Sequence, residues 1–201
     1  MFIVIDKEKI YSYVIALSTI VILFVMANVV NNRSSDFLFT SSLNRLVPIY
    51  SVDIKEKQIA LTMNCAWNAD DIDNILDTLS KNKIHITFFI VGDWAEKYPE
   101  YVKKIANAGH EIANHSNTHP HVNKLSISEN ADEITKASEK IKKITGRETT
   151  LYRAPYGEYN NTVLNAAAEK NHITIQWNLD TLDYTRNNRR RDVEKNRTWI
   201  E

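Results

Sequence analysis

The sequence predicts an α/β fold whose strands form a parallel sheet, either open or closed into a barrel. From residue 57 to residue 184, short apolar runs that suit strands alternate with helical patterns of ~10–15 residues. Helices placed between strands in this way cross over the sheet and keep the strands parallel. Gly92, Gly109 and Gly146 each close one of these elements, as glycine does where the backbone must turn.

Five short runs are the expected strands. Each is rich in apolar residues, several of them β-branched or aromatic, which pack well on a pleated surface. The runs are residues 58–62, 86–90, 111–114, 150–152 and 173–177.

Helical patterns fill the gaps between these runs. The first starts behind Asp70 and Asp71, an acidic cap for the apolar stripe that contains Ile72, Ile75 and Leu79. The other expected helices cover residues 101–108, the stretch from Ser126 or Ser128 to Gly146, and residues 160–170.

Polar clusters follow four of the five expected strands. In a parallel sheet the carboxyl ends of the strands lie on one rim, where ligands bind. We therefore expect the four clusters to converge on a single site. They are LTMNCAW (61–67), NHSNTHPH (114–121), YRAPYG (152–157) and WNLDTLDY (177–184).

The histidine-rich cluster could hold a metal ion. His115 and His119 can place two neutral imidazoles on one divalent ion if the loop makes about one helical turn. A pair of solvated loop histidines fits the same spacing. Cys65 is a candidate third ligand, because a thiolate binds zinc, although a small buried side chain fits it equally well. Asp70 and Asp71 are the carboxylate alternatives.

The remaining clusters supply a charge and aromatic surfaces. Arg153 offers a fixed positive charge, and Pro155 and Tyr156 offer a rigid turn with an aromatic wall. Trp177 adds an apolar face, and Asp180 adds a carboxylate. Together with the histidines, these residues predict a polar pocket with a sugar-binding aromatic floor.

The amino-terminal part predicts a membrane anchor. Residues 10–30 run for 21 positions without a charge, which is long enough to span ~30 Å of hydrocarbon as a helix. A buried core helix would show a polar side, and a cleaved signal would have a shorter apolar core. Residues 1–9 are then a cytoplasmic head and residues 31–56 a linker, and the globular part lies outside the cytoplasm.

Charge is balanced overall but uneven along the chain. The 25 basic and 25 acidic residues give a net charge of zero, so no general attraction to nucleic acid is expected. The last 17 residues, 185–201, hold six basic and three acidic residues. We expect this tail to be a solvated appendix that does not belong to the fold and binds no nucleic acid.

The clusters, in their order, resemble the polysaccharide deacetylase family, or NodB-homology domain. The combination of HSNTH, RAPYG and DTLDY carries the resemblance, which covers residues 57–184. The Ala66–Trp67 pair after the first strand is most similar to the membrane-anchored, sporulation-associated PdaB-type branch. The resemblance implies a distorted (β/α) barrel, here incomplete at its carboxyl-terminal end.

The resemblance also implies an activity, the removal of the acetyl group from N-acetylated amino sugars of cell-wall polysaccharide. In the family, a metal held by Asp-His-His activates water, an aspartate acts as base and a late histidine as acid. By position, His115 and His119 match the metal ligands, and the Tyr156 backbone N–H faces the oxyanion. Arg153 would orient the base, and Asp180 would orient the acid histidine.

Two departures from the family pattern affect this expectation. Asn64 stands where the base belongs and Cys65 where the metal aspartate belongs, so a bound ion would be expected to be zinc. No histidine follows Asp183, which suggests a truncated, frame-shifted or naturally short copy. The sequence thus leaves a weak or inactive deacetylase and a membrane-anchored glycan-binding module as alternatives. An unrelated metallohydrolase is less favoured, because RAPYG has no role in it.

Overall fold

The computed structural model describes residues 11, 16–25 and 45–181. The chain divides into two compact units, Met1–Arg45 and Leu46–Glu201, and the second contains the sheet. Residues 16–25 are helical. Within the described ranges, none of the helices has the length and the hydrophobicity that a membrane span requires. The predicted span 10–30 is only partly described, so the anchor stays a prediction. Asp183 and the tail lie outside the described residues.

The second unit is built on a five-stranded parallel sheet with the order β1-β2-β3-β4-β5. The predicted α/β class with a parallel sheet is confirmed. Each strand lies beside its neighbour in the sequence, as in the wall of a barrel. The strands are β1 Thr62–Cys65, β2 Thr87–Ile90, β3 Glu111–Asn114, β4 Leu151–Tyr152 and β5 Ile173–Thr174.

The first strand lies further along the chain than the sequence predicted. The expected run 58–62 is exposed, and the strand that pairs with β2 starts at Thr62 and ends at Cys65. Apolar character does not fix the register of a strand, which depends on its pairing with the neighbouring strand. Because β1 runs to Cys65, Asn64 and Cys65 belong to a pleated strand rather than to a loop. Their side chains therefore point to opposite faces of the sheet.

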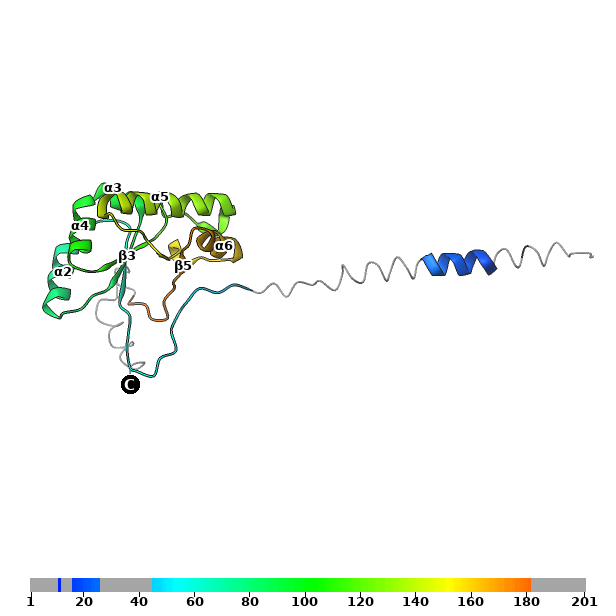
Figure 1. The fold of residues 1–201 in the computed structure, drawn as a ribbon, viewed down its shortest axis with the longest axis horizontal. Coiled ribbons are helices and arrows are strands. Elements are labelled where there is room, and N and C mark those ends of the chain that lie inside the picture. Colours follow the sequence, from blue (N-terminus) through cyan, green and yellow to red (C-terminus); the bar gives the residue numbers. More distant parts are fainter. Residues whose placement is uncertain (1–10, 12–15, 26–44, 182–201) are drawn as a thin grey trace, which may run out of the picture. The chain divides into compact units, whose positions relative to one another are not determined.

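Helices connect the strands and, in Figure 1, lie around the outside of the sheet. The long helix α5 starts at the first of the two predicted serines and has the predicted end: Ser126 forms a reciprocal capping box with Glu129, and Gly146 ends the helix in the left-handed conformation. The short helix α3 was not predicted, because six residues are too few to show a periodic pattern. The helices are α2 Ile72–Lys81, α3 Gly92–Lys97, α4 Pro99–Asn107, α5 Ile127–Thr145 and α6 Asn161–Glu169.

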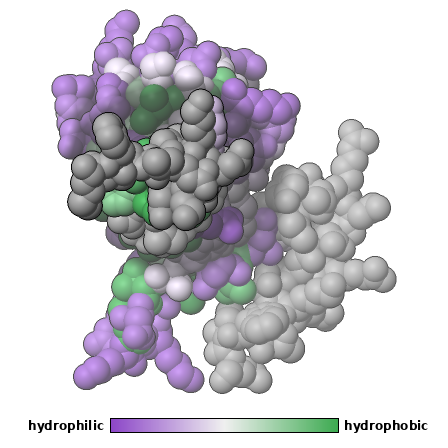
Figure 2. Space-filling view, turned by 90° about the vertical axis from the view of Figure 1, so that its right-hand side faces the viewer, coloured by the Kyte–Doolittle hydropathy of each residue, from purple (hydrophilic) through white to green (hydrophobic). Residues whose placement is uncertain are grey.

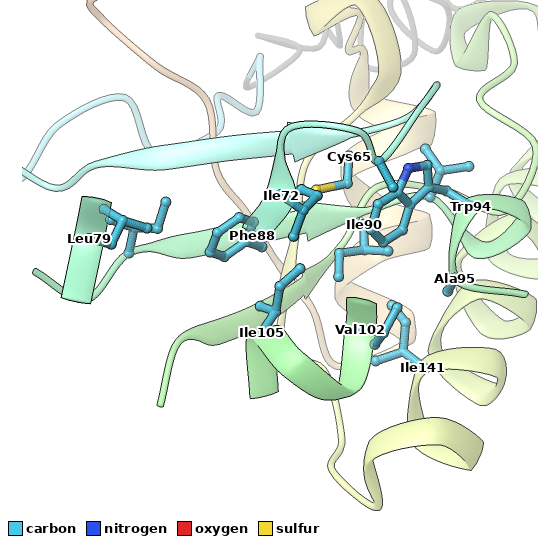
Figure 3. Close-up of a cluster of buried hydrophobic side chains, with 13 residues drawn as sticks. Cys65, Ile72, Leu79, Phe88, Ile90, Trp94, Ala95, Val102, Ile105 and Ile141 are labelled. Atoms are coloured by element: carbon cyan, nitrogen blue, oxygen red, sulfur yellow. The ribbon is translucent and has the colours of Figure 1, made fainter. Parts of the chain in front are cut away.

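The main hydrophobic core lies between the sheet and helices α2 to α5. Figure 3 shows Phe88 and Ile90 of β2 packed against side chains from these helices, including Ile72 and Val102. Phe89, between them in sequence, is also fully buried and lies under the guanidinium of Arg153, 3.9 Å from its ring centre. The alternation of β2 thus gives one face to the helices and the other to a buried arginine.

The folded unit begins earlier than predicted. Ile49 forms a parallel bridge with Ile175: its N–H donates to the Thr174 carbonyl at 2.9 Å, and its own carbonyl accepts from the Gln176 N–H at 2.8 Å. Residues 46–50 were expected in the linker 31–56. They belong instead to the compact unit that starts at Leu46.

In the space-filling view of one side, the described surface is mainly hydrophilic with smaller hydrophobic patches (Figure 2).

Candidate functional site

His115 follows β3 and is held as a neutral ring. The side chain is 2% exposed, and its Nδ1 lies 2.7 Å from the Arg153 carbonyl oxygen. Since a carbonyl can only accept, Nδ1 carries the proton and Nε2 keeps its lone pair. Burial lowers the pKa of His115 to about 3, so the ring is uncharged near neutral pH. His115 is thus prepared to accept a hydrogen bond or bind an ion through Nε2.

His119 lies beside His115, as the sequence predicted. The two ring centres are 5.0 Å apart and the rings are nearly perpendicular. His119 has a positive φ of 60°, an uncommon conformation for a residue with a side chain. Burial lowers its pKa as well, so it also favours the neutral form. The loop after β3 therefore holds two neutral imidazoles next to each other.

A carboxylate on α5 holds the loop between these histidines. Glu133 Oε2 accepts from Ser116 Oγ at 2.8 Å, from the Asn117 N–H at 2.9 Å and from the Thr118 N–H at 2.8 Å. Such charge-assisted bonds are stronger than neutral ones and offset the strain of Ser116, whose φ is 68°. No pattern in the sequence pointed to Glu133, which resembles any other charged residue on a helix.

Arg153 joins the strand ends beneath the histidines. Its Nη1 donates to Thr62 Oγ1 at 2.9 Å and to Asn64 Oδ1 at 3.0 Å, and its Nη2 donates to the Gln176 carbonyl at 3.3 Å. Burial lowers the pKa of Arg153 to about 10, whereas the charge of Asp180 acts to raise it. The side chain thus stays protonated and links β1 to the segment after β5. Sequence reasoning missed Thr62 and Gln176 as its partners.

Asn64 occupies the predicted place but cannot act as a base. Its amide oxygen accepts from Arg153, so the amide NH2 group is directed away from the guanidinium. A side-chain amide takes up no proton at physiological pH. Where an aspartate would have paired with Arg153 and received a proton, this chain offers a hydrogen-bond donor.

Cys65 lies in the hydrophobic core, which argues against its predicted role as a metal ligand. It points to the opposite face of β1 from Asn64, is 3% exposed and packs among apolar side chains such as Ile72 and Trp94 (Figure 3). Burial, with a smaller contribution from Asp71, raises the pKa of its thiol to about 12, and a protonated thiol is a poor ligand. In the described part of the chain, no three His, Cys, Asp or Glu residues form a group that could hold a metal.

The RAPYG segment forms a tight turn over the site. The N–H groups of Gly157 and Glu158 donate to the carbonyls of Ala154 and Pro155, whereas that of Tyr156 has no acceptor among the described residues. Tyr156 has a φ of 58°. Its backbone N–H is thus available to a ligand oxygen, and its role as the oxyanion donor stays a prediction. Pro155 is buried, so it shapes the turn and presents no surface to a ligand.

Aromatic rings gather around His119. The Tyr156 ring meets it edge to face at 4.6 Å and stacks on His121 at 4.3 Å, with the two planes 15° apart. His121 Nδ1 lies 2.7 Å from Glu158 Oε1, which joins the loops after β3 and β4. Trp177 lies 5.4 Å from the Arg153 guanidinium. The structure therefore brings together the predicted Asn64, His115, His119, Arg153 and Tyr156.

Comparison with known proteins agrees with this arrangement. Residues 51–175 match the family model of polysaccharide deacetylases. The chain belongs to this family. The peptidoglycan N-acetylglucosamine deacetylase of Bacillus cereus is 36% identical over 135 residues, which cover 67% of this chain and 49% of the relative. The peptidoglycan N-acetylmuramic acid deacetylase PdaC of Bacillus subtilis is 34% identical over 145 residues, which cover 72% of this chain and 30% of that protein.

Solved structures show the same fold. The Bacillus anthracis protein BA3943, described as a pseudoenzyme of carbohydrate esterase family 4, has a TM-score of 0.67 and 33% identity; the match covers 69% of this chain and 49% of that one. A mutant of BA3943 is described as having restored enzymatic activity. This deacetylase-family chain spans about half or less of the length of such relatives.

Proposed function

We propose that this deacetylase-family domain binds cell-wall polysaccharide made of N-acetylated amino sugars and hydrolyses its acetamide groups slowly or not at all. One observation carries the proposal: the pleat of β1 directs the amide of Asn64 into the site and the thiol of Cys65 into the core. The relatives that act on peptidoglycan N-acetylglucosamine and N-acetylmuramic acid support the substrate class.

The site matches the hydrogen-bonding groups of an acetamide. The Asn64 NH2 group and the Tyr156 N–H are donors suited to the acetyl oxygen, and the neutral histidines offer acceptors for the acetamide N–H. Arg153 fixes the orientation of Asn64. General-base catalysis is worth ~10²–10⁴-fold in rate, and Asn64 supplies none of it. These groups therefore bind the substrate without activating water.

Metal-dependent deacetylation is the second candidate, favoured by the two adjacent neutral imidazoles. His115 and His119 can supply two donors for a divalent ion, with zinc the expected one, but Cys65 does not fit as the third. A bound zinc ion would lower the pKa of its water toward ~7. With two protein donors rather than three, we expect the ion to bind weakly.

Binding and hydrolysis can be measured on the same full-length protein in detergent. We expect it to bind N-acetylglucosamine oligomers and to release no acetate above background with zinc present. Asn64→Asp alone should leave acetate release at background, because the third donor is still missing. Rapid acetate release by the wild type that stops with a chelator and with His119→Ala would overturn the proposal in favour of efficient hydrolysis.

We further propose that residues 10–30 anchor the protein in a membrane, with residues 1–9 in the cytoplasm and the domain outside, next to the wall. The uncharged stretch of 21 residues supports this, and so does the helix over residues 16–25. Membership of the sporulation-type branch remains a prediction of the sequence. When cells are stripped of their wall but keep an intact membrane, added protease should cleave the domain. Protection of the domain from the protease would contradict this orientation.

A further inference from the structure

Trp67 stands beside the histidine loop in the turn after β1. Its side chain is 70% exposed, and its ring centre lies 5.7 Å from that of His119. Its indole N–H has no acceptor among the described residues. Exposure of one aromatic ring alone indicates little. The contact with His119, at the centre of the site, is what makes this ring notable.

The turn that carries Trp67 is anchored to the core. The indole N–H of Trp94, which is 2% exposed, donates to the Asn68 carbonyl at 3.0 Å. The next residue, Ala69, is buried in the same core, and the Asn68 side chain donates to Asp70 at 3.1 Å. The backbone on the carboxyl side of Trp67 is thus fixed, which keeps this residue next to the histidine loop, where its ring contacts His119.

Trp67 and Tyr156 both contact His119 and are 70% and 57% exposed. Trp177, which the sequence offered as the aromatic floor, is placed differently. It packs so closely on the turn that a Cβ at Gly157 would lie 2.9 Å from its ring, and its other neighbour is Arg153. The rings best placed for a ligand at the histidines therefore come from the loops after β1 and β4.

We propose that Trp67 is a sugar-stacking residue that forms, with Tyr156, a two-sided aromatic site for a chain of N-acetylated pyranose rings at His119. The inference rests on the proposed function and adds a specificity-determining residue to it. A pyranose has an apolar face of C–H groups, which suits the negative face of an aromatic ring. The free indole N–H can donate to a sugar hydroxyl, and His121 and Glu158 provide further polar partners at the rim.

The test compares Trp67→Ala with Trp67→Phe in the full-length protein. Affinity for N-acetylglucosamine oligomers is measured by titration calorimetry, and stability by thermal unfolding. We expect Trp67→Ala to weaken binding by on the order of 10- to 30-fold, as truncation of a central aromatic contact does. Trp67→Phe should retain affinity to within about threefold, and neither variant should change the unfolding temperature, because the ring is mostly exposed.

Three outcomes would overturn the inference. Unchanged affinity in Trp67→Ala would remove Trp67 from the site while leaving the proposed function standing. Weaker binding with a lower unfolding temperature in both variants would show that Trp67 supports the turn rather than the ligand. Absence of binding by the wild type would overturn both this inference and the proposed function.

Discussion

Substitution of Glu133 tests most clearly how the fold positions the two histidines. Its carboxylate accepts from Ser116, Asn117 and Thr118, between the two imidazoles. In Glu133→Gln one oxygen remains, but an NH2 group now faces hydrogen-bond donors. A hydrogen bond to a charged group is worth ~1.5–3 kcal/mol, and several are weakened together. We therefore expect the free energy of unfolding to fall by ~2–3 kcal/mol, or roughly 5–10 °C in unfolding temperature.

Urea unfolding in detergent measures this loss, and amide hydrogen exchange locates it. The Asn117 and Thr118 amides should lose protection in Glu133→Gln beyond the change in global stability. Glu139→Gln is the matched control, since it makes the same change at an exposed position on α5. The control should stay within about 0.5 kcal/mol of the wild type. Equal stability of the two variants, with both amides still protected, would refute the reasoning.

Two further predictions concern protonation and the RAPYG turn. Burial lowers the pKa of His115 in the folded protein to about 3, whereas a histidine in the unfolded chain takes up a proton below pH ~6.5. The stability that the neutral His115 ring contributes is complete above pH ~6.5 and is lost as the pH falls below that value. The free energy of unfolding at pH 5 should therefore be about 2 kcal/mol below that at pH 7. In urea titrations, His115→Gln should show a smaller fall between the two pH values. Gly157→Ala should lower the unfolding temperature more than Gly146→Ala. Both glycines have positive φ, but only at Gly157 does the added Cβ meet a ring, that of Trp177.

Much of the fold could be predicted from local patterns. The third strand and the cap and end of α5 appear in the structure where the sequence placed them, because they depend on side chains a few residues apart. The register of β1 could not be predicted in this way. It is set by pairing with β2, and the exposed run before Thr62 is as apolar as a strand. The early start of the folded unit at Leu46 likewise depends on a partner far along the chain, Thr174.

In the site, too, features that depend on local spacing could be predicted, and features that depend on distant partners could not. The pairing of His115 with His119 followed from their spacing, and the convergence of the polar clusters followed from the shared rim of the sheet. The placement of Arg153 against Asn64 followed from the family resemblance. The direction of Cys65 did not, because it depends on where β1 begins. Glu133 gave no local signal either, since its three donors come from a loop 15 to 17 residues away.

Whether the Cys65 thiolate binds a metal tests the central claim most directly. The full-length protein is titrated with Co²⁺, which takes ligands similar to those of zinc, and followed by near-ultraviolet absorption, where sulfur-to-cobalt charge transfer appears. Because β1 turns Cys65 into the core, away from His115 and His119, we predict weak binding without a charge-transfer band. A band that saturates with one equivalent of Co²⁺ and disappears in Cys65→Ala would contradict the account.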